Sequence, residues 1–297
     1  MPGPAIHTNA AGAIRPFYMW AGGKGRLVKE YLEWWPDMAD YDHYVEPFFG
    51  GGAIFCWMNN EYGHLSGSVG EINAELVGVL REVRGHPKRF ILRAQKLAAE
   101  FLAVDNHEDR KKWYYEHRAL YWKSPDPATL YVLMRLGFNG IWQTCRDSKG
   151  LFGTPAGLLG QTSSVQVIDP TLIRNWSNAL ADVAIHGGSY EKIPLDSKGR
   201  SLIYLDPPYR QSFTSYGTGF SDADQEKLIV WFKEQAGAGH KVLLANRDDV
   251  GDGFFEQRLS DVADLHWFDV TYTAGRRKKI EGGYAAKKAR EFLAISR

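Results

Sequence analysis

The stretch that decides the fold is Ser201-Leu202-Ile203-Tyr204-Leu205-Asp206-Pro207-Pro208-Tyr209. Its mostly apolar first half lies between Gly199-Arg200 and two prolines, which predicts a buried strand over residues 201–205. Neither proline offers an N–H group to a neighbouring strand, so the strand must end there. Ligands of open α/β sheets bind beyond the carboxyl ends of the strands. The sequence therefore predicts an α/β fold with its chemistry at residues 206–209.

The four residues Asp206, Pro207, Pro208 and Tyr209, here named the DPPY tetrad, suit chemistry on the exocyclic amine of a nucleobase. Such an amine is a poor nucleophile because its lone pair is delocalised into the ring. The Asp206 carboxylate and the Pro207 carbonyl could each accept one hydrogen, which favours a tetrahedral nitrogen and frees the lone pair. Tyr209 could stack on the base. The alternative is a strand-ending turn with a solvated Asp206, because four residues match by chance fairly often.

Composition is that of a globular protein with a large core: 297 residues, 44% hydrophobic and 24% charged. Cys56 and Cys145 show neither metal-site nor disulfide-framework spacing, so we expect no metal site. No apolar run approaches the roughly 18 residues of a membrane span. Residues 1–14 lack the features of a secretory signal and are expected to form a loose arm. A cytoplasmic location is the default expectation.

Charge is distributed unevenly along the chain, although the net charge is only +1. Residues 81–180 contain 15 Lys and Arg against 9 Asp and Glu, whereas the remainder carries an acidic excess. A basic middle indicates a surface for a polyanion such as nucleic acid. A solvated helical domain that happens to be basic is the alternative.

Two glycine-rich stretches precede the predicted strand. Trp20-Ala21-Gly22-Gly23-Lys24 would let backbone approach a ligand closely, although Trp20 could equally be core packing. Glu46-Pro47-Phe48-Phe49-Gly50-Gly51-Gly52 ends a short strand and opens a helix, as nucleotide-type sites do. Neither stretch is a P-loop, and the second carries no basic residue. It therefore suits an adenosine-type cofactor that lacks phosphates or carries positive charge.

An acidic residue follows the second glycine turn at about the distance, roughly 20 residues, where nucleotide sites hold ribose hydroxyls. It is Glu71, within Glu71-Ile72-Asn73. Its alternative role is that of an acid near the start of the helix that follows.

These motifs together resemble the Dam-type DNA adenine-N6 methyltransferases. The family order is WAGGK at 20–24, VEPFFGGG at 45–52, EIN at 71–73 and DPPY at 206–209. The similarity continues through RLGFNG at 135–140, KGLF at 149–152, VLLAN at 242–246 and RKK at 277–279, and so covers most of the chain. Any one motif is weak, but four in order are specific.

The resemblance implies a Rossmann-like, seven-stranded sheet with a reversed hairpin, built from residues 1–80 and 181–297. Residues 81–180 would be an inserted, mostly helical target-recognition domain. It also implies S-adenosylmethionine as cofactor and a flipped-out adenine of double-stranded DNA as substrate. The DPPY tetrad would be catalytic, and Asp in front of Pro-Pro points to adenine N6. The residues expected at the cofactor are Trp20, Ala21, Gly22, Gly23, Lys24, Glu46, Pro47, Phe48, Gly50, Gly52, Glu71, Ile72, Asn73 and Asp206.

Two regions are expected to contact DNA. The glycine-rich loop 138–157 would read bases, because loops of this length are usually functional and Arg, Asn and Gln suit base edges. Its candidates are Asn139, Gln143, Arg146 and Lys149. The basic turn with Arg276, Arg277, Lys278 and Lys279 would contact phosphates, with a merely solvated hairpin as the alternative.

Three departures from the family pattern leave the recognised DNA sequence open. Arg146 follows Asn139-Gly140 at a longer distance than usual, Glu71 replaces the usual Asp, and Arg247 replaces a common His. Rival interpretations are an RNA or protein N-methyltransferase and a binding protein that has lost catalysis; the intact DPPY tetrad argues against the latter. We expect a monomeric, nucleoid-associated enzyme of a prokaryote or its virus, with or without a restriction partner.

Local patterns also predict individual helices. Residues 26–35, 79–101 and 110–123 show helical spacing, and Ser221 with Asp224 is typical of a capping box that opens a helix. The aromatic residues at 113–122 are expected mainly in the core.

Overall fold

The computed structural model describes residues 12–18, 20, 24–195, 199–210, 219–248, 250–272, 278–280, 283–285 and 287–297, without the side chains of 271–288. The chain forms two compact units. The first unit comprises the described residues of Met1–Glu33 and Phe48–Pro194; the second comprises those of Trp34–Pro47, Leu195–Thr214 and Gly219–Arg297. The predicted recognition domain falls within the first unit, and its boundaries stay a prediction.

A seven-stranded sheet has the order β3-β2-β1-β4-β5-β9-β6. Its strands are β1 (His43–Glu46), β2 (Gly67–Glu71), β3 (Val183–Gly187), β4 (Ser201–Leu205), β5 (Lys241–Arg247), β6 (Ala263–Tyr272) and β9 (Lys287–Ser296). Strand β9 runs antiparallel to both β5 and β6, whereas β4 is parallel to β1 and β5. The predicted sheet with a reversed hairpin is thereby confirmed. Strands β7 (Lys278–Ile280) and β8 (Gly283–Ala285) pair in a separate ribbon.

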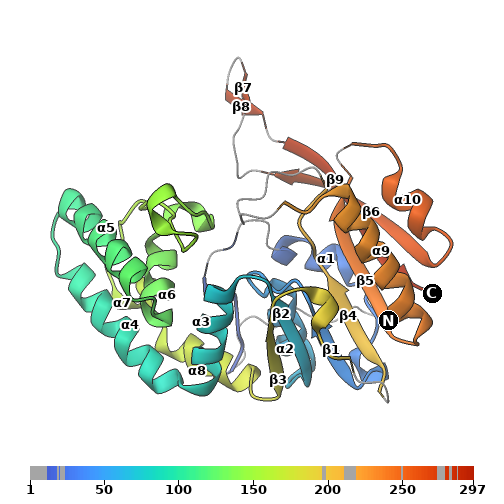
Figure 1. Ribbon diagram of the computed structural model, residues 1–297, viewed down its shortest axis with the longest axis horizontal. Helices are drawn as coiled ribbons and strands as arrows, with labels where there is room; N and C mark the ends of the chain where they lie inside the picture. Colours follow the sequence, from blue (N-terminus) through green and yellow to red (C-terminus); the bar gives the residue numbers. More distant parts are fainter. Residues whose placement is uncertain are drawn as a thin grey trace. The chain divides into compact units, whose positions relative to one another are not determined.

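In the second unit, the sheet is covered by helices, which explains its continuous apolar strands. All five residues of β4 are buried, as are Val242 to Ala245 of β5. Helices α9 (Asp222–Gly237) and α10 (Phe254–Leu259) pack on β5 and β6 (Figure 1). Helix α9 begins at the predicted capping box: the Asp224 carboxylate accepts from the Ser221 N–H at 2.9 Å, and the Ser221 hydroxyl accepts from the Asp224 N–H at 3.2 Å.

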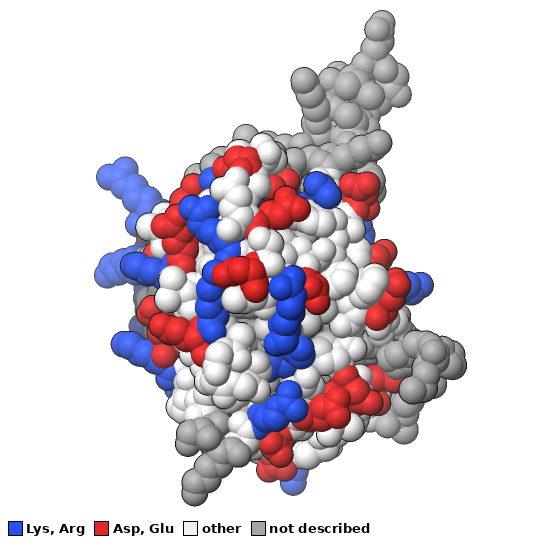
Figure 2. All heavy atoms as spheres, turned by 90° about the vertical axis from the view of Figure 1, so that its right-hand side faces the viewer, with Lys and Arg blue, Asp and Glu red and all other residues white. Residues whose placement is uncertain are grey.

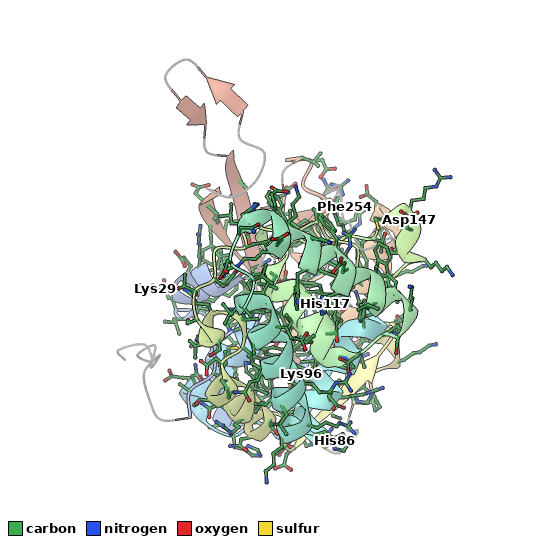
Figure 3. The ribbon with its side chains drawn as sticks, turned by 90° about the vertical axis from the view of Figure 1, so that its left-hand side faces the viewer. Lys29, His86, Lys96, His117, Asp147 and Phe254 are labelled. Atoms are coloured by element: carbon green, nitrogen blue, oxygen red, sulfur yellow. The ribbon has the colours of Figure 1, made fainter. Side chains whose placement is uncertain are left out.

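The first unit is mainly helical around β2 and β3. Its helices are α1 (Val28–Tyr31), α2 (Ala53–Tyr62), α3 (Ala74–Gly85), α4 (Pro87–Leu102), α5 (His107–Lys123), α6 (Pro127–Leu136), α7 (Ser164–Val167) and α8 (Pro170–Ala179). Helix α6 packs against α3, α4 and α5; Figure 3 labels Lys96 on α4 and His117 on α5. Trp113, Tyr114 and Tyr121 of α5 are buried, so the expectation of core aromatics is confirmed for them.

Two predicted helices were wrong. The pattern over 79–101 is divided between α3 and α4, because Pro87 lacks an N–H and occupies the first turn of a new helix. The pattern over 26–35 yields only the short α1. There, the Trp34 ring stacks on His266 at 4.0 Å between centroids, and Trp35 lies 5.5 Å from Tyr204. These aromatic side chains pack on strands β6 and β4 instead of continuing a helix.

Surface charges of the second unit are paired across its elements. Lys233 contacts Asp261 at 2.9 Å, and Arg297 contacts Asp264 at 2.9 Å. Figure 2 shows acidic and basic side chains interspersed on one face of the molecule. The described part of that face therefore lacks the single-sign field that a polyanion surface needs. Among the described residues, no helix combines the length and apolarity needed to cross a bilayer.

Candidate functional site

A glycine turn, Gly50–Gly52, connects the chain after β1 to α2 in the first unit. Gly50 and Gly52 have φ of +48° and +63°, the left-handed region that favours glycine. A Cβ on Gly50 would lie 2.7 Å from Trp20 Nε1, and one on Gly51 would lie 2.7 Å from Trp20 Cβ. The Tyr18 hydroxyl donates to the Gly50 carbonyl at 2.6 Å. Half-buried Trp20 thus lies directly on the turn, which only glycine permits.

Glu71 ends β2 and connects the glycine turn to α3. Its side chain is buried at 7% exposure; one carboxylate oxygen accepts from the Gly50 N–H at 3.1 Å and the other from the Asn73 N–H at 2.8 Å. Burial raises the pKa of the Glu71 carboxyl, and hydrogen bonds from the backbone of Asn73, Gly50 and Ile72 oppose that rise. A carboxylate offers about four lone-pair positions, so both oxygens retain acceptor capacity.

Asn73 is the N-cap of α3. Its side-chain oxygen accepts from the Glu75 N–H at 2.9 Å and from the Leu76 N–H at 3.4 Å. Asn73 therefore caps α3, while the Glu71 carboxylate holds the Asn73 backbone N–H. Ile72 between them exposes 63% of its surface.

The other residues predicted at the cofactor differ in burial and contacts and belong to both units. Lys24 is 3% exposed, and the Phe48 ring lies 5.3 Å from that of Tyr190. In the second unit, Glu46 ends β1 and accepts a hydrogen bond from Tyr44 at 2.8 Å, followed by the buried Pro47. Ala21, Gly22 and Gly23 lie outside the described residues. The structure thus brings Trp20, the glycine turn, Glu71 and Asn73 together within one unit.

The DPPY tetrad follows β4 in the second unit. Asp206 is half-buried and Pro207 is buried. The Pro208 carbonyl accepts from Gln225 Nε2 at 2.8 Å, and Gln225 Oε1 accepts from Asn246 Nδ2 at 3.2 Å. Gln225 and Asn246 are both fully buried, where polar groups must be paired. Helix α9 and strand β5 therefore fix the backbone of the tetrad.

Tyr209 is held by two neighbouring strands. Its hydroxyl donates to Glu291 Oε1 on β9 at 3.2 Å, and the guanidinium carbon of Arg247 on β5 lies 4.6 Å from its ring centroid. Arg247 and Glu291 are paired in register. Burial raises the pKa of Tyr209, and the charges of Asp206 and Glu291 act in the same direction. The phenol therefore stays a neutral donor with a cation on its ring.

Sequence reasoning missed Gln225 and Glu291, although each leaves a signal. Gln225 precedes Leu228, Ile229 and Phe232 at helical spacing, which places an amide on the inward face of α9. Glu291 begins an otherwise apolar strand end. A polar residue on a face that the pattern marks as buried indicates a specific partner.

The loop 138–157, here named the recognition loop, is fastened to α3 and α5 in the first unit. Glu75 accepts from the Phe152 N–H at 3.1 Å, and Trp122 Nε1 donates to the Phe152 carbonyl at 2.8 Å. Arg118 Nη1 donates to the carbonyls of Gly153 and Thr154 at 2.7 and 2.9 Å. These contacts give a loop of irregular structure a defined backbone.

The four candidate base readers all lie on the recognition loop. Asn139, Arg146 and Lys149 are exposed, while Gln143 is half-buried and its carbonyl accepts from the Gly153 N–H at 2.7 Å. Figure 3 labels Asp147, the neighbour of Arg146, in a short 3₁₀ turn. An open cavity of about 370 Å³ is lined by Arg15, Pro16, Tyr18, Trp20, Arg135 and Asn139.

The side chains of the predicted phosphate contacts lie outside the described residues. This applies to Arg276 and Arg277 as whole residues and to the side chains of Lys278 and Lys279. Within the described ranges, no group of three or more His, Cys, Asp or Glu residues could hold a metal ion.

Comparisons with known proteins agree on one family. The sequence model of the D12 class N6 adenine-specific DNA methyltransferases matches residues 20–274. The chain is 29% identical to the type II methyltransferase M.MjaIII of Methanocaldococcus jannaschii, over 80% of this chain and 86% of that protein. It is 29% identical to a DNA adenine methylase of Vibrio cholerae, over 95% of both. It is 27% identical to a type II methyltransferase of Lactococcus lactis subsp. cremoris, over 91% and 92%. The chain therefore belongs to the D12 class N6 adenine-specific DNA methyltransferases.

Proposed function

We propose that this enzyme transfers a methyl group from S-adenosylmethionine to the N6 amine of an adenine flipped out of a short duplex DNA site. The observation that supports this most is the polar support of the DPPY tetrad. Pro208 is hydrogen-bonded to the buried Gln225, and Tyr209 is held by Glu291 and Arg247. These contacts hold the backbone that follows Asp206 and Pro207, the two proposed acceptors. Acceptors that are fixed before the reaction need no reorganisation when positive charge develops on the amine.

Three members of the tetrad act on the base in this proposal. The Asp206 carboxylate and the Pro207 carbonyl accept the two amine hydrogens, which directs the nitrogen lone pair toward the methyl group. Asp206 stabilises the positive charge that develops on the nitrogen and would accept the proton that the methylated amine must release. Tyr209 stacks on the adenine, and its neutral hydroxyl keeps the ring oriented through Glu291.

The residues of the first unit fit S-adenosylmethionine, which supplies an electrophilic methyl group on a sulfonium. Buried Glu71 retains acceptor capacity for the two ribose hydroxyls. Exposed Ile72 offers an apolar surface for the adenine ring. The glycine turn, on which Trp20 lies, carries no basic residue that would repel a sulfonium.

Base flipping gives the test of this function. Extrusion of a paired adenine costs a few kcal/mol, and less at a mismatch. We expect the enzyme to bind more tightly when the target adenine faces a mismatch or an abasic site than when it faces thymine. Fluorescence anisotropy with matched duplexes measures this, with the same lesion placed outside the site as control. Equal affinity for all duplexes would show that the base is reached without flipping. Sedimentation of the same complexes checks the proposed monomeric state.

Arg146 is expected to read a base rather than a phosphate. It is exposed on a loop that Glu75, Trp122 and Arg118 fasten, so its backbone position is defined. Arg146→Ala should cost about 1–3 kcal/mol on the cognate site and relax discrimination at one position. Sequencing-based methylation profiles of DNA from a host without adenine methylation measure both effects.

Lys149→Ala removes another exposed cation of the recognition loop and is the matched control. As a phosphate contact, it should lower methylation at all sites without changing the motif. If Arg146→Ala also keeps a sharp motif at lower intensity, Arg146 contacts a phosphate. Gln143 or Asn139 would then be the better candidate for base reading.

A further inference from the structure

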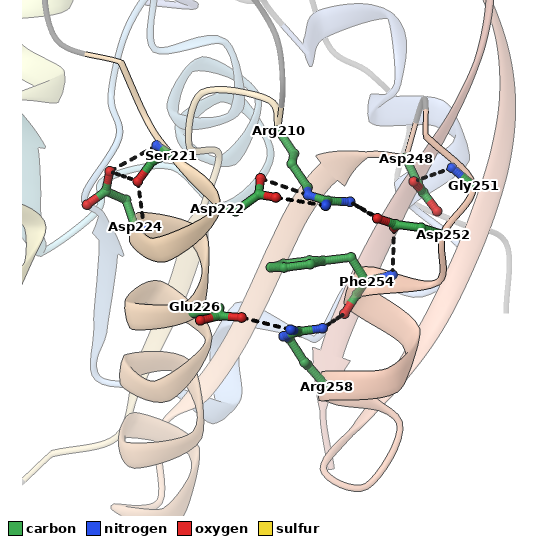
Figure 4. Close-up of polar contacts among 10 residues, drawn as sticks. All are labelled: Arg210, Ser221, Asp222, Asp224, Glu226, Asp248, Gly251, Asp252, Phe254 and Arg258. Atoms are coloured by element: carbon green, nitrogen blue, oxygen red, sulfur yellow. Dashed lines mark hydrogen bonds and ion pairs between the residues drawn. The ribbon is translucent and has the colours of Figure 1, made fainter.

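The residue directly after the DPPY tetrad, Arg210, is paired with two carboxylates at once (Figure 4). Its Nε and Nη2 donate to the two oxygens of Asp222 at 2.9 and 2.8 Å, and its Nη1 donates to both oxygens of Asp252 at 2.7 Å. The guanidinium carbon lies 4.2 Å from the centroid of the Phe254 ring. Arg210 itself is 8% exposed. The planar guanidinium is thus fixed in both position and orientation.

The two carboxylates belong to the beginnings of two helices. Asp222 is the first residue of α9, next to its N-cap Ser221. Asp252 precedes α10 and also accepts from the Phe254 N–H at 3.1 Å. Hydrogen bonds from Arg210 are the largest cause that lowers the pKa of both aspartates, so both are charged at neutral pH. Arg210 therefore joins the end of the tetrad to both helix starts.

Three consecutive residues have separate partners on separate elements. Pro208 is bonded to α9 through Gln225, Tyr209 to β9 through Glu291, and Arg210 to Asp222 and Asp252. Adjacent Cα atoms are about 3.8 Å apart, so a displaced Arg210 must move the Tyr209 backbone. Displacements of about 1 Å at a reacting group can cost about 10²-fold in rate.

We propose that Arg210 is a positioning residue for methyl transfer: its contacts with Asp222 and Asp252 fix the end of the DPPY tetrad and thereby orient Tyr209. This inference rests on the proposed catalytic role of the tetrad. Arg210 touches neither the base nor the methyl donor in this scheme. It acts through Tyr209 alone.

Arg258 provides a matched control in the same unit. Its Nη2 donates to Glu226 Oε1 on α9 at 2.7 Å, and its guanidinium carbon lies 4.0 Å from the same Phe254 ring (Figure 4). It therefore also joins α9 to α10 and covers the same aromatic residue. It is distant in sequence from the tetrad. The Arg258 side chain is more exposed than that of Arg210, 35% against 7%, so its loss removes less packing, and it leaves the chain next to Tyr209 unaltered.

The test compares Arg210→Met with Arg258→Met, because methionine keeps an apolar stem and removes the guanidinium. We expect Arg210→Met to lower the single-turnover rate of methyl transfer about 10- to 100-fold, with unchanged affinity for S-adenosylmethionine. Arg258→Met should stay within about twofold of the wild-type rate, even if the two substitutions lower the Tm by the same amount. Arg210→Lys should fall between them, because lysine is a point charge that cannot contact both carboxylates bidentately.

A double variant, Asp222→Asn with Asp252→Asn, removes the charges without changing shape and replaces Arg210→Met if the latter does not fold. It should show the same loss of rate. Equal rates for the Arg210 and Arg258 variants, or a rate that merely follows Tm, would overturn the proposal. Asp206→Ala distinguishes failure of the positioning role of Arg210 from failure of the proposed catalytic role of the tetrad. If it is inactive while Arg210→Met is normal, only the positioning role fails; if it is active, the role of the tetrad fails.

Discussion

Asp206→Ala is expected to lower the rate of methyl transfer by about 10²–10³ while leaving the affinity for S-adenosylmethionine within about tenfold. Asp206 follows a strand whose five residues are all buried, and the backbone after it is fixed by Gln225. Loss of a preorganised acceptor for the developing positive charge removes about 2–4 kcal/mol of transition-state stabilisation. Single-turnover transfer at saturating cofactor measures the change.

Asp206→Asn is the informative companion of this variant. The amide keeps one acceptor oxygen but replaces the other with a donor and removes the charge, so its rate should lie between those of Asp206→Ala and the wild type. Thermal unfolding and cofactor calorimetry establish that both variants are folded. Activity of Asp206→Ala close to wild type would refute the assignment of the DPPY tetrad.

Glu71→Ala is expected to weaken S-adenosylmethionine binding by about 1.5–3 kcal/mol, the value of hydrogen bonds to a charged group. The same change also removes the carboxylate to which the Gly50 and Asn73 N–H groups donate. Glu71→Gln keeps the shape and tests the charge alone. Isothermal calorimetry measures both. Unchanged affinity would move the ribose role elsewhere, with Asn73 as the next candidate.

The affinity for S-adenosylmethionine should change with pH as the Glu71 carboxyl titrates. Burial raises its pKa above the ordinary value of 4.5. The ionised carboxylate accepts both ribose hydroxyls, so affinity is full above the raised pKa and falls by up to about tenfold per pH unit below it. The contribution of Glu71 to the free energy of unfolding changes with pH in the opposite direction. It is present in acid and is lost as pH rises through the pKa of the folded state. Glu71→Gln should flatten the binding profile, and an unchanged profile would assign the titration to another group.

Local signals predicted the elements that surround the site. Apolar residues bounded by Gly199 and Pro207 gave β4 its observed bounds, Ser201–Leu205. The capping box at Ser221 placed the start of α9, and the strand, glycine turn and helix after His43 were confirmed. These features depend on neighbours in sequence, so composition and spacing suffice to find them.

The partners of the tetrad were not predictable in this way. Tyr209 and Glu291 are 82 residues apart, and Arg210 and Asp252 are 42 residues apart. The first contact depends on the placement of β9 between β5 and β6, and the second on the segment between β5 and α10; no local pattern determines either. The helix pattern over 79–101 failed for a different reason, because apolar spacing continued across Pro87 although the backbone could not.

The most direct test of the central claim is to incubate the enzyme with S-adenosylmethionine that carries a tritiated methyl group and to identify the labelled product. Parallel reactions contain duplex DNA, RNA and protein, and the nucleic acids are digested to nucleosides for chromatography. We predict label in N6-methyl-2′-deoxyadenosine from the DNA and none with Asp206→Ala. Label in N4-methylcytosine, in RNA or in protein, or no label although the cofactor binds, would contradict the account.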